Sequence, residues 1–219
     1  MALNGPGYTG MVYVAPGPGT VFTDEATTKN TTTVTLNGIS YSAYQVYSIT
    51  NAAKRYWDLD TAITVKKNSS VVTNYSYQAC GGIIIFASAN ISTDVITVSG
   101  KYFPYSKASG IKSYNLKLGH KLADATKYTD TDDVCKPMNK NGSGSLVLID
   151  FDNYYTDLLG QRLVGVFLLG GTYNAYDSSG PRWECYFLLN GWTTDLPVDD
   201  LISQSHDFTI SHERHYRST

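Results

Sequence analysis

Residues 62–102 contain four short segments rich in Val, Ile, Thr and Tyr, and only a few residues separate each segment from the next. Because β-branched and aromatic side chains favour extended backbone, we expect strands at 62–67, 71–78, 83–87 and 95–102. A parallel crossover needs about a dozen residues or more, which these connections do not have. The most regular part of the chain therefore predicts antiparallel strands.

Further strands are expected on both sides of this region, separated by turns rich in Gly, Pro, Asn and Asp. We place them at 9–14, 32–36, 41–49, 111–118, 145–151, 163–169, 183–189 and 207–211. Short helical segments are expected at 51–58 and 153–159. Three Asn-Gly pairs indicate additional turns, because both residue types tolerate positive φ. These pairs are Asn37-Gly38, Asn141-Gly142 and Asn190-Gly191.

The predicted fold is mainly β, an antiparallel sandwich or barrel with one or two short helices and a long projecting loop. We expect residues 1–30 to form an N-terminal arm and loop and residues 31–219 to form one β domain. Residues 51–105 are a candidate small module inserted in that domain. The chain has 219 residues, 42% hydrophobic and 16% charged, which is typical of a globular protein with a conventional core.

The composition also limits the partners that we expect. A net charge of -2 leaves no excess of Lys and Arg to wrap nucleic acid tightly. The longest apolar runs, 83–87 and 164–169, fall far short of the roughly 20 residues that cross a bilayer. The first ten residues lack the features of a secretory signal, so we expect folding in a cytoplasm. The widely spaced Cys80, Cys135 and Cys185 are expected to be thiols.

Candidate groups for catalysis or metal binding are scattered along the sequence. The densest His group lacks the spacing of a zinc motif, and no nucleophile elbow accompanies the cysteines. The paired carboxylates lie in turn-like segments, where Asp favours local backbone hydrogen bonds. We therefore expect a non-enzymatic protein with no cofactor and no metal. The groups considered are His206, His212 and His215; Cys80 or Cys185 with His120; and the pairs Asp58/Asp60, Asp132/Asp133 and Asp199/Asp200.

Residues 119–144 differ from the rest of the chain. They contain few large apolar side chains, an acidic cluster at Asp130, Asp132 and Asp133, and a glycine-rich end. A structureless segment of this length is uncommon inside a compact domain unless it has a function. We expect a projecting loop or hairpin here.

Two stretches carry a resemblance to known proteins. The first, KRYWDLDTAITVKKNSSVVTNYSYQACGGIIIFASANISTDVITVSGKYFP, resembles a small β module of phage structural proteins. The second contains LVLIDFDNYYTDLLGQRLVGVFLLGG followed by RWECYFLLNGWTTDLPVDDLISQSHDFTIS, and it resembles the major tail tube proteins of long-tailed, siphovirus-like bacteriophages. Together the two stretches cover over half of the chain.

This resemblance implies a virion protein of the phage tail, made in the host bacterial cytoplasm. Six copies would close into a ring, and rings would stack into a tube that carries DNA at infection without binding it specifically. The other partners implied are the tape measure protein and the tail terminator or tip proteins. The resemblance implies that the N-terminal arm and the long loop 119–144 make the contacts between stacked rings. The candidate assembly residues are Tyr8, Val12, Tyr128, Asp130, Asp132, Asp133, Pro137 and Met138.

Two alternatives stay open from the sequence. The chain could be a different virion protein, such as a head decoration, tail-tip or adhesion module, in which 54–104 is the outward-facing binder. It could also be a carbohydrate-binding or carbohydrate-active β protein, because Tyr is abundant, with 18 residues, and aromatic rings line sugar grooves.

Overall fold

The computed structural model describes residues 12–15, 19–107, 111–124, 135–148, 154–168, 182–195 and 203–217. These residues confirm the predicted mainly β fold, because antiparallel curled sheets form half-barrels with little helix. The chain divides into two compact units. Unit 1 comprises Met1–Ser109, Gln161–Tyr186 and His212–Thr219, and unit 2 comprises Gly110–Gly160 and Phe187–Ser211.

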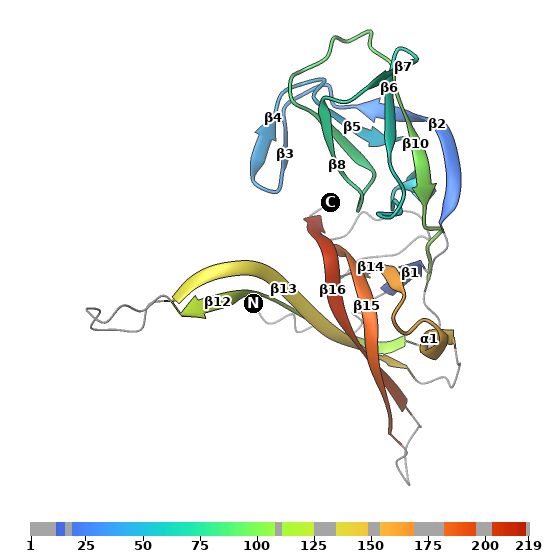
Figure 1. Cartoon of the computed structure of the whole chain (residues 1–219), viewed down its shortest axis with the longest axis vertical. Helices are drawn as coiled ribbons and strands as arrows, with labels where there is room; N and C mark the ends of the chain where they lie inside the picture. Colours follow the sequence, from blue (N-terminus) through green and yellow to red (C-terminus); the bar gives the residue numbers. More distant parts are fainter. Residues whose placement is uncertain are drawn as a thin grey trace, which may run out of the picture. The chain divides into compact units, whose positions relative to one another are not determined.

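One seven-stranded sheet of the described chain lies wholly in unit 1, with strand order β7-β6-β10-β2-β5-β9-β8 (Figure 1). Its strands are β2 (Thr20–Lys29), β5 (Val46–Ile49), β6 (Thr64–Lys67), β7 (Ser70–Val72), β8 (Tyr75–Gln78), β9 (Ile83–Phe86) and β10 (Ile96–Tyr102). A separate hairpin joins β3 (Val34–Leu36) to β4 (Ile39–Tyr41), and a 3-10 turn occupies Ala52–Lys54. All the neighbouring pairs in this sheet are antiparallel. The short connections predict the pairs β6–β7 and β8–β9 correctly. The expected single strand 71–78 is wrong, because it divides into β7 and β8 at opposite ends of the sheet, and β9 and β10 are not neighbours.

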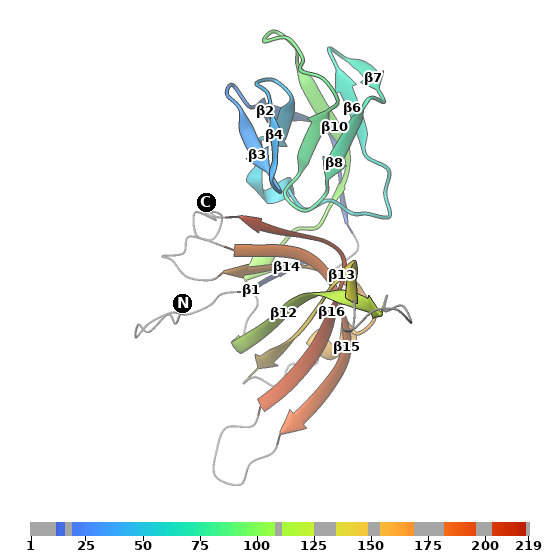
Figure 2. The same cartoon turned by 90° about the vertical axis from the view of Figure 1, so that its left-hand side faces the viewer.

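The other seven-stranded sheet has the order β11-β1-β14-β15-β16-β13-β12 (Figure 2). Its strands are β1 (Val12–Ala15), β11 (Ser106–Lys107), β12 (Ile111–Asp124), β13 (Cys135–Leu148), β14 (Arg162–Leu168), β15 (Arg182–Asp195) and β16 (Ser203–Arg217). A short helix, α1 (Tyr154–Asp157), lies between β13 and β14 in the chain. The residues of β15 and β16 are shared between the two units.

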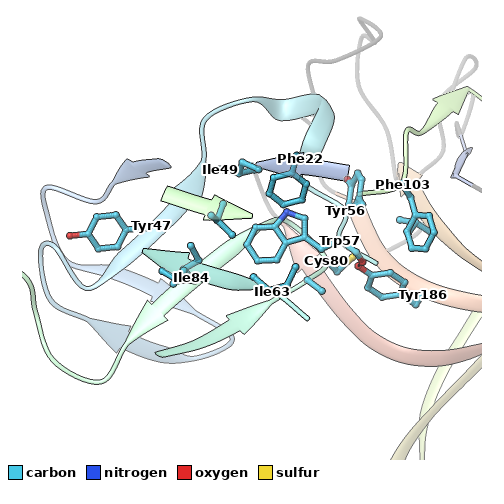
Figure 3. Packing of buried hydrophobic residues seen from close by; sticks show 14 of the residues in the cluster. Phe22, Tyr47, Ile49, Tyr56, Trp57, Ile63, Cys80, Ile84, Phe103 and Tyr186 are labelled. Atoms are coloured by element: carbon cyan, nitrogen blue, oxygen red, sulfur yellow. The ribbon is translucent and has the colours of Figure 1, made fainter. Parts of the chain in front are cut away.

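Aromatic side chains fill the core of unit 1 (Figure 3). Trp57 is completely buried, and its ring centroid lies 6.2 Å from that of Phe22 on β2. The Trp57 carbonyl oxygen accepts a hydrogen bond of 2.5 Å from the hydroxyl of Tyr186, and the Trp57 indole N–H donates to the Lys54 carbonyl. The KRYWDLD segment therefore provides the centre of a hydrophobic core.

The segment expected to be an arm and loop, residues 1–30, contains the ten-residue strand β2, so that expectation is wrong for Thr20–Lys29. Only Phe22 of this strand is buried, so its sequence lacks the alternation of apolar and polar residues by which a strand is predicted. Long-range partners define it instead: β10 on one side and β5 on the other. The sheet that holds the candidate module 51–105 therefore begins at Thr20.

Of the three Asn-Gly pairs expected to form turns, one does so and two do not, and one expected strand is interrupted. Asn37 and Gly38 have φ of 51° and 82° and join β3 to β4, as predicted. The expected strand 41–49 is interrupted, because Tyr44 has φ of 61° between β4 and β5. Asn141-Gly142 lies inside β13 and Asn190-Gly191 inside β15, so neither pair forms the expected turn.

Candidate assembly surface

Among the described strands of unit 2, β12 has an open outer edge. This strand is 14 residues long and stands at the end of its sheet. It pairs with β13 on one side, from Ile111 opposite Leu148 to Asp124 opposite Cys135, and no described strand lies on its other side. Such an edge presents backbone donors and acceptors to any chain that can add a strand.

The hairpin of β12 and β13 confirms one of the two forms expected for residues 119–144, although 125–134 lie outside the described residues. Its register shifts between His120 and Leu122, opposite Pro137 and Lys140. A proline cannot donate to the ladder, so it is tolerated best at such an irregularity. The two strands therefore stay paired on both sides of the register shift at His120 and Leu122.

Two glycines allow close packing around β13. A Cβ atom on Gly144 would lie 2.0 Å from the Asn115 carbonyl oxygen and 2.4 Å from the Phe208 ring. A Cβ atom on Gly142 would lie 2.4 Å from the Ile210 side chain. Glycine is needed at these two positions because a side chain would overlap neighbouring atoms of the sheet. The glycine-rich end of 119–144 is therefore compatible with a closely packed strand.

The candidate interface residues from the sequence fall in three places. Val12 is in β1, where it pairs with Phe167, and Pro137 and Met138 are in β13, where Pro137 pairs with Leu122. The remaining five lie outside the described residues: Tyr8, Tyr128, Asp130, Asp132 and Asp133. The open edge starts in 111–118, which the sequence predicts as a strand without marking it as a border, and it continues to Asp124.

The unit 2 part of this sheet has one apolar face. Leu146 of β13, Phe187 of β15 and Phe208 of β16 are buried, and the rings of Phe187 and Phe208 are 5.0 Å apart. Helix α1 packs on this face, because Tyr155 is buried and its ring lies 5.8 Å from the ring of His206. Leu158, just beyond the helix, is also buried, so this face is covered.

The opposite face of the same strands is polar. Cross-strand register places Asn115 opposite Ser145, which in turn lies opposite Asp207, and it places Lys117 opposite Ser143. These side chains surround a shallow trough of about 300 Å³. The trough is lined by Asn115, Lys117, Ser143, Gly144, Ser145, Asn190, Asp207, Phe208 and Thr209.

Two charged groups of opposite sign lie in this trough. Neither Lys117 nor Asp207 forms an ion pair with any residue that the structure describes. The other polar groups are hydroxyls and amides, and the Asn190 side-chain amide donates a 2.8 Å hydrogen bond to the Thr209 hydroxyl. This surface cannot be predicted from the sequence, because the alternation in 111–118 indicates a shared polar face only once 142–145 is known to form part of the neighbouring strand.

His206 is the most unusual polar group of unit 2. Its side chain is completely buried on the apolar face, and neither ring nitrogen has a hydrogen-bond partner among the described residues. Burial lowers the pKa of His206 below its ordinary value, and the charge of Asp207 opposes that effect. The folded protein therefore favours the neutral imidazole at this position.

Unit 1 contains a buried polar cluster of its own. The Arg182 guanidinium donates a 2.7 Å hydrogen bond to a carboxylate oxygen of Glu184, and the Tyr56 hydroxyl donates a 3.2 Å bond to the same oxygen. All three side chains are buried. Burial raises the pKa of Tyr56 well above its ordinary value, and the Glu184 charge adds to that effect. These contacts satisfy the buried charges and stabilise the packing.

The remaining chemical candidates have structural contacts. Cys80 and Cys185 are buried free thiols, as expected of these two. The Asp58 carboxylate accepts a hydrogen bond from the Asp60 backbone N–H, and Asp60 forms an ion pair of 2.8 Å with Arg162. His212 lies near the Tyr186 ring, whereas His215 contacts the Asn37 side chain.

The described residues contain no group of three or more His, Cys, Asp or Glu side chains arranged to hold a metal ion. The side chain of His120 and all of Asp132, Asp133, Asp199 and Asp200 lie outside the description. Two of the three carboxylate pairs from the sequence are therefore without a structural assignment.

A mixed groove of about 430 Å³ lies in unit 1. Tyr41 and Tyr75 border it, Ile85 and Phe86 contribute apolar surface, and Asn74 is exposed at its rim. The Tyr75 hydroxyl donates to the Ile63 carbonyl, which fixes its ring. Aromatic rings beside exposed amide and hydroxyl groups are suited to polar, ring-shaped ligands.

Comparison with protein-family models finds no match for the chain, and a search of curated proteins finds no similar sequence. None of the helices in the described part of the chain has the length and apolar character needed to cross a bilayer.

Proposed function

We propose that this chain is a structural subunit that assembles with copies of itself into rings, and that the rings stack into the tail tube of a long-tailed phage. The observation that carries the proposal is the open edge of β12, 14 residues long, at the border of a seven-stranded sheet. A neighbouring copy that adds its own edge strand would satisfy the backbone groups along this border.

The two borders of this sheet are different, which favours a ring. One border is β12, and the other is the two-residue strand β11 beside β1. Pairing between unlike edges of identical subunits is head to tail, and such contacts close into rings when the rotation allows it. In this arrangement the tape measure and the terminator or tip proteins are the further partners, and the phage virion is the location.

Assembly of the purified protein tests this function directly. We expect light scattering after gel filtration to detect oligomers, and negative-stain electron microscopy to reveal rings or tubes of uniform width. The protein should be examined over a range of concentrations, with and without other tail components as nucleators. A subunit that stays monomeric under all these conditions would contradict the proposal.

Proline substitution can locate the contact. The backbone N–H groups of an edge strand point alternately toward the partner strand and toward the open side, so Asn115→Pro and Leu116→Pro form a matched pair. We expect one of the two to abolish assembly and still fold, and the other to damage the hairpin. Val71→Pro, in the edge strand β7 of unit 1, serves as the control that keeps assembly. Equal assembly by all three folded variants would exclude the β12 edge.

The groove in unit 1 favours a second candidate function, attachment to carbohydrate. Tyr41 and Tyr75 border the groove, and the side chains of Thr73, Asn74 and Ser76 are exposed at its side. Binding of soluble glycans should then be detected by a glycan array and lost in a Tyr41→Ala variant. Assembly of that variant into tubes should be unchanged if the two functions are separate.

A further inference from the structure

We infer that Asn37, in the turn between β3 and β4, is a site of spontaneous deamidation and that the carboxylate formed there pairs with His215 of β16. The reaction consumes water and needs no enzyme, cofactor or partner. The inference does not depend on the proposed assembly, because the turn and the histidine both belong to unit 1 of a single chain.

The first argument comes from the position of Asn37 in a tight turn. Leu36 of β3 pairs with Ile39 of β4, so only Asn37 and Gly38 lie between the paired residues. Both have positive φ, 51° and 82°, as turns of this kind require. Both are also exposed, and a Cβ atom on Gly38 would meet nothing within 4 Å. The backbone nitrogen of Gly38 is therefore uncrowded and lies outside the hairpin ladder.

This nitrogen is the nucleophile of the reaction. Once it has lost its proton, it attacks the side-chain carbonyl carbon of Asn37. A new carbon–nitrogen bond forms, the bond to the amide nitrogen breaks, and that nitrogen takes up protons and leaves as ammonia. Water then opens the cyclic imide at either carbonyl group and gives aspartate or isoaspartate at position 37. In sum, one amide and one water become one carboxylic acid and one ammonia.

The second argument comes from a contrast with two other Asn-Gly pairs. Gly142 pairs with Leu118 inside β13, where an added Cβ atom would lie 2.4 Å from Ile210. Asn190 lies in β15, and its amide donates a 2.8 Å hydrogen bond to the Thr209 hydroxyl. Ring closure at either pair requires a paired strand to open first, and only a small fraction of molecules is open at any time. Ring closure at the turn requires the movement of two exposed residues.

The third argument comes from the neighbour of the side chain. The Asn37 amide nitrogen lies 3.1 Å from Nδ1 of the buried His215, and the amide oxygen lies 3.4 Å from the same atom. An amide offers both a donor and an acceptor, so it suits this ring nitrogen with or without a proton, whereas a carboxylate offers acceptors only. Deamidation therefore favours a protonated Nδ1 and replaces a neutral contact with a charge-assisted hydrogen bond.

The two products should affect this contact in opposite ways. Asp-Gly suits the same turn as Asn-Gly, so the aspartate product keeps the hairpin and its contact with β16. The isoaspartate product adds a methylene group to the backbone, which a two-residue turn does not accommodate. The aspartate form therefore holds the end of β16 more firmly on the hairpin, and the isoaspartate form releases it.

Peptide mass spectrometry tests the site. The purified protein is kept at neutral pH and physiological temperature, sampled over weeks and digested, and fragment spectra assign each NH2-to-OH mass change to one asparagine. We expect the change at Asn37 to accumulate at least about tenfold faster than at Asn141 or Asn190, because the strands protect those pairs. Asn37→Gln is the matched control, since it keeps the amide but would have to close a larger, less favourable ring. The peptide with Asn4-Gly5, which lies outside the described residues, is scored separately.

The same measurement in guanidinium chloride separates fold from sequence. Without the strands, the pairs at 37, 141 and 190 should react at similar rates. Reaction at Asn37 no faster than at Asn141 and Asn190 in the folded protein would overturn the assignment of this site. Rates that stay far apart in denaturant would overturn the argument from strand protection.

The variant Asn37→Asp tests the contact with His215, because it places the aspartate product in every molecule. In mildly acidic buffer the backbone amides of 212–217 should exchange about threefold more slowly than in the parent, as expected of a modest ion pair. The gain should vanish when His215→Gln is added. Asn74→Asp, which adds the same charge at another exposed position of unit 1, is the control and should leave this exchange unchanged. Unchanged exchange in Asn37→Asp would overturn the pairing with His215.

Discussion

The unit 1 sheet and the unit 2 part of the other sheet differ in how their faces and edges are covered. In unit 1 the aromatic core around Trp57 lies on one side, and a second cluster of Val46, Ile83 and Ile85 is packed by residues of the β3–β4 hairpin. In unit 2 the helix covers one face, while the other face is polar and the β12 edge is open. The first arrangement is completed largely by its own chain. The second leaves one border and one polar face uncovered by any strand or helix that the structure describes.

The largest effect on this comparison is expected from Trp57→Ala. Trp57 is fully buried at the centre of the unit 1 core, so truncation removes about 3–5 kcal/mol of stability through lost burial and a cavity. Denaturant unfolding followed by fluorescence and circular dichroism measures the loss. Val71→Ala, at an exposed position of the same sheet, is the control and should change stability little. A Trp57→Ala protein as stable as the parent would contradict the assignment of this core.

Gly144→Ala should have the next largest effect. The new methyl group would overlap the Asn115 carbonyl and the Phe208 ring, and overpacking of this kind costs about 1–3 kcal/mol. Gly191→Ala is the matched control, because its added Cβ would meet its nearest neighbour at 3.9 Å. Thermal unfolding of the two variants measures the difference. Equal melting temperatures would show that β13 is not packed as closely as described.

Acidic pH should destabilise unit 2 through His206. The pKa of His206 is lower in the folded protein than in the unfolded chain. At mildly acidic pH the unfolded state therefore binds a proton at this residue more readily than the folded state does. Stability is therefore full above the unfolded value of about 6.5 and declines as the pH falls from there toward the folded pKa. Denaturant unfolding between neutral and mildly acidic pH should reveal this slope.

A pair of histidine variants sharpens the pH measurement. His206→Leu should reduce the slope, because the buried titrating group is gone. His212→Ala, which removes an exposed imidazole, should keep it. Retention of the full slope in His206→Leu would assign the pH dependence to other groups.

The smallest effect is expected from Asp60→Asn. Asp60 is 76% exposed in its ion pair with Arg162, and exposed pairs contribute about 0–1 kcal/mol. Salt should weaken the contribution further. Melting curves at low and high salt provide the measurement, and a loss well above this range would indicate that the pair belongs to a larger network.

The sequence predicts β6, β9 and β10 within 62–102, because their alternation and turns are local. It does not separate β7 from β8, because their places at opposite ends of the sheet depend on strands that are distant in the chain. It also places short helical segments near Ala52–Lys54 and Tyr154–Asp157. The strand β2 is not predicted, because only Phe22 of its ten residues is buried and its partners in β10 are distant in the chain, as in the pair Thr20 and Tyr102. Gly142 is misread as part of a turn, and Gly144 is not recognised as part of a strand, because the need for space near Ile210, Asn115 and Phe208 arises only in the folded sheet.

For the candidate surface, too, the sequence predicts the local feature but not the feature that depends on distant residues. The alternation of 111–118 is local and predicts a strand, but an edge is defined by a missing neighbour, which sequence pattern does not encode. The polar face requires the register of three strands, with Asn115, Ser145 and Asp207 side by side. The alternation of polar and apolar residues predicts only that each of these residues lies on a polar face, and it does not predict that they are neighbours.

The division of the chain into interleaved units has a consequence for its synthesis. The chain passes between the units at residues 109–110, 160–161, 186–187 and 211–212, and Asn37 contacts His215 across 178 positions of sequence. Contacts this distant form slowly, because loop closure must precede them. A ribosome must release residues 212–217 before unit 1 is complete. Any assembly that requires a complete unit 1 can therefore begin only after these residues have been synthesised.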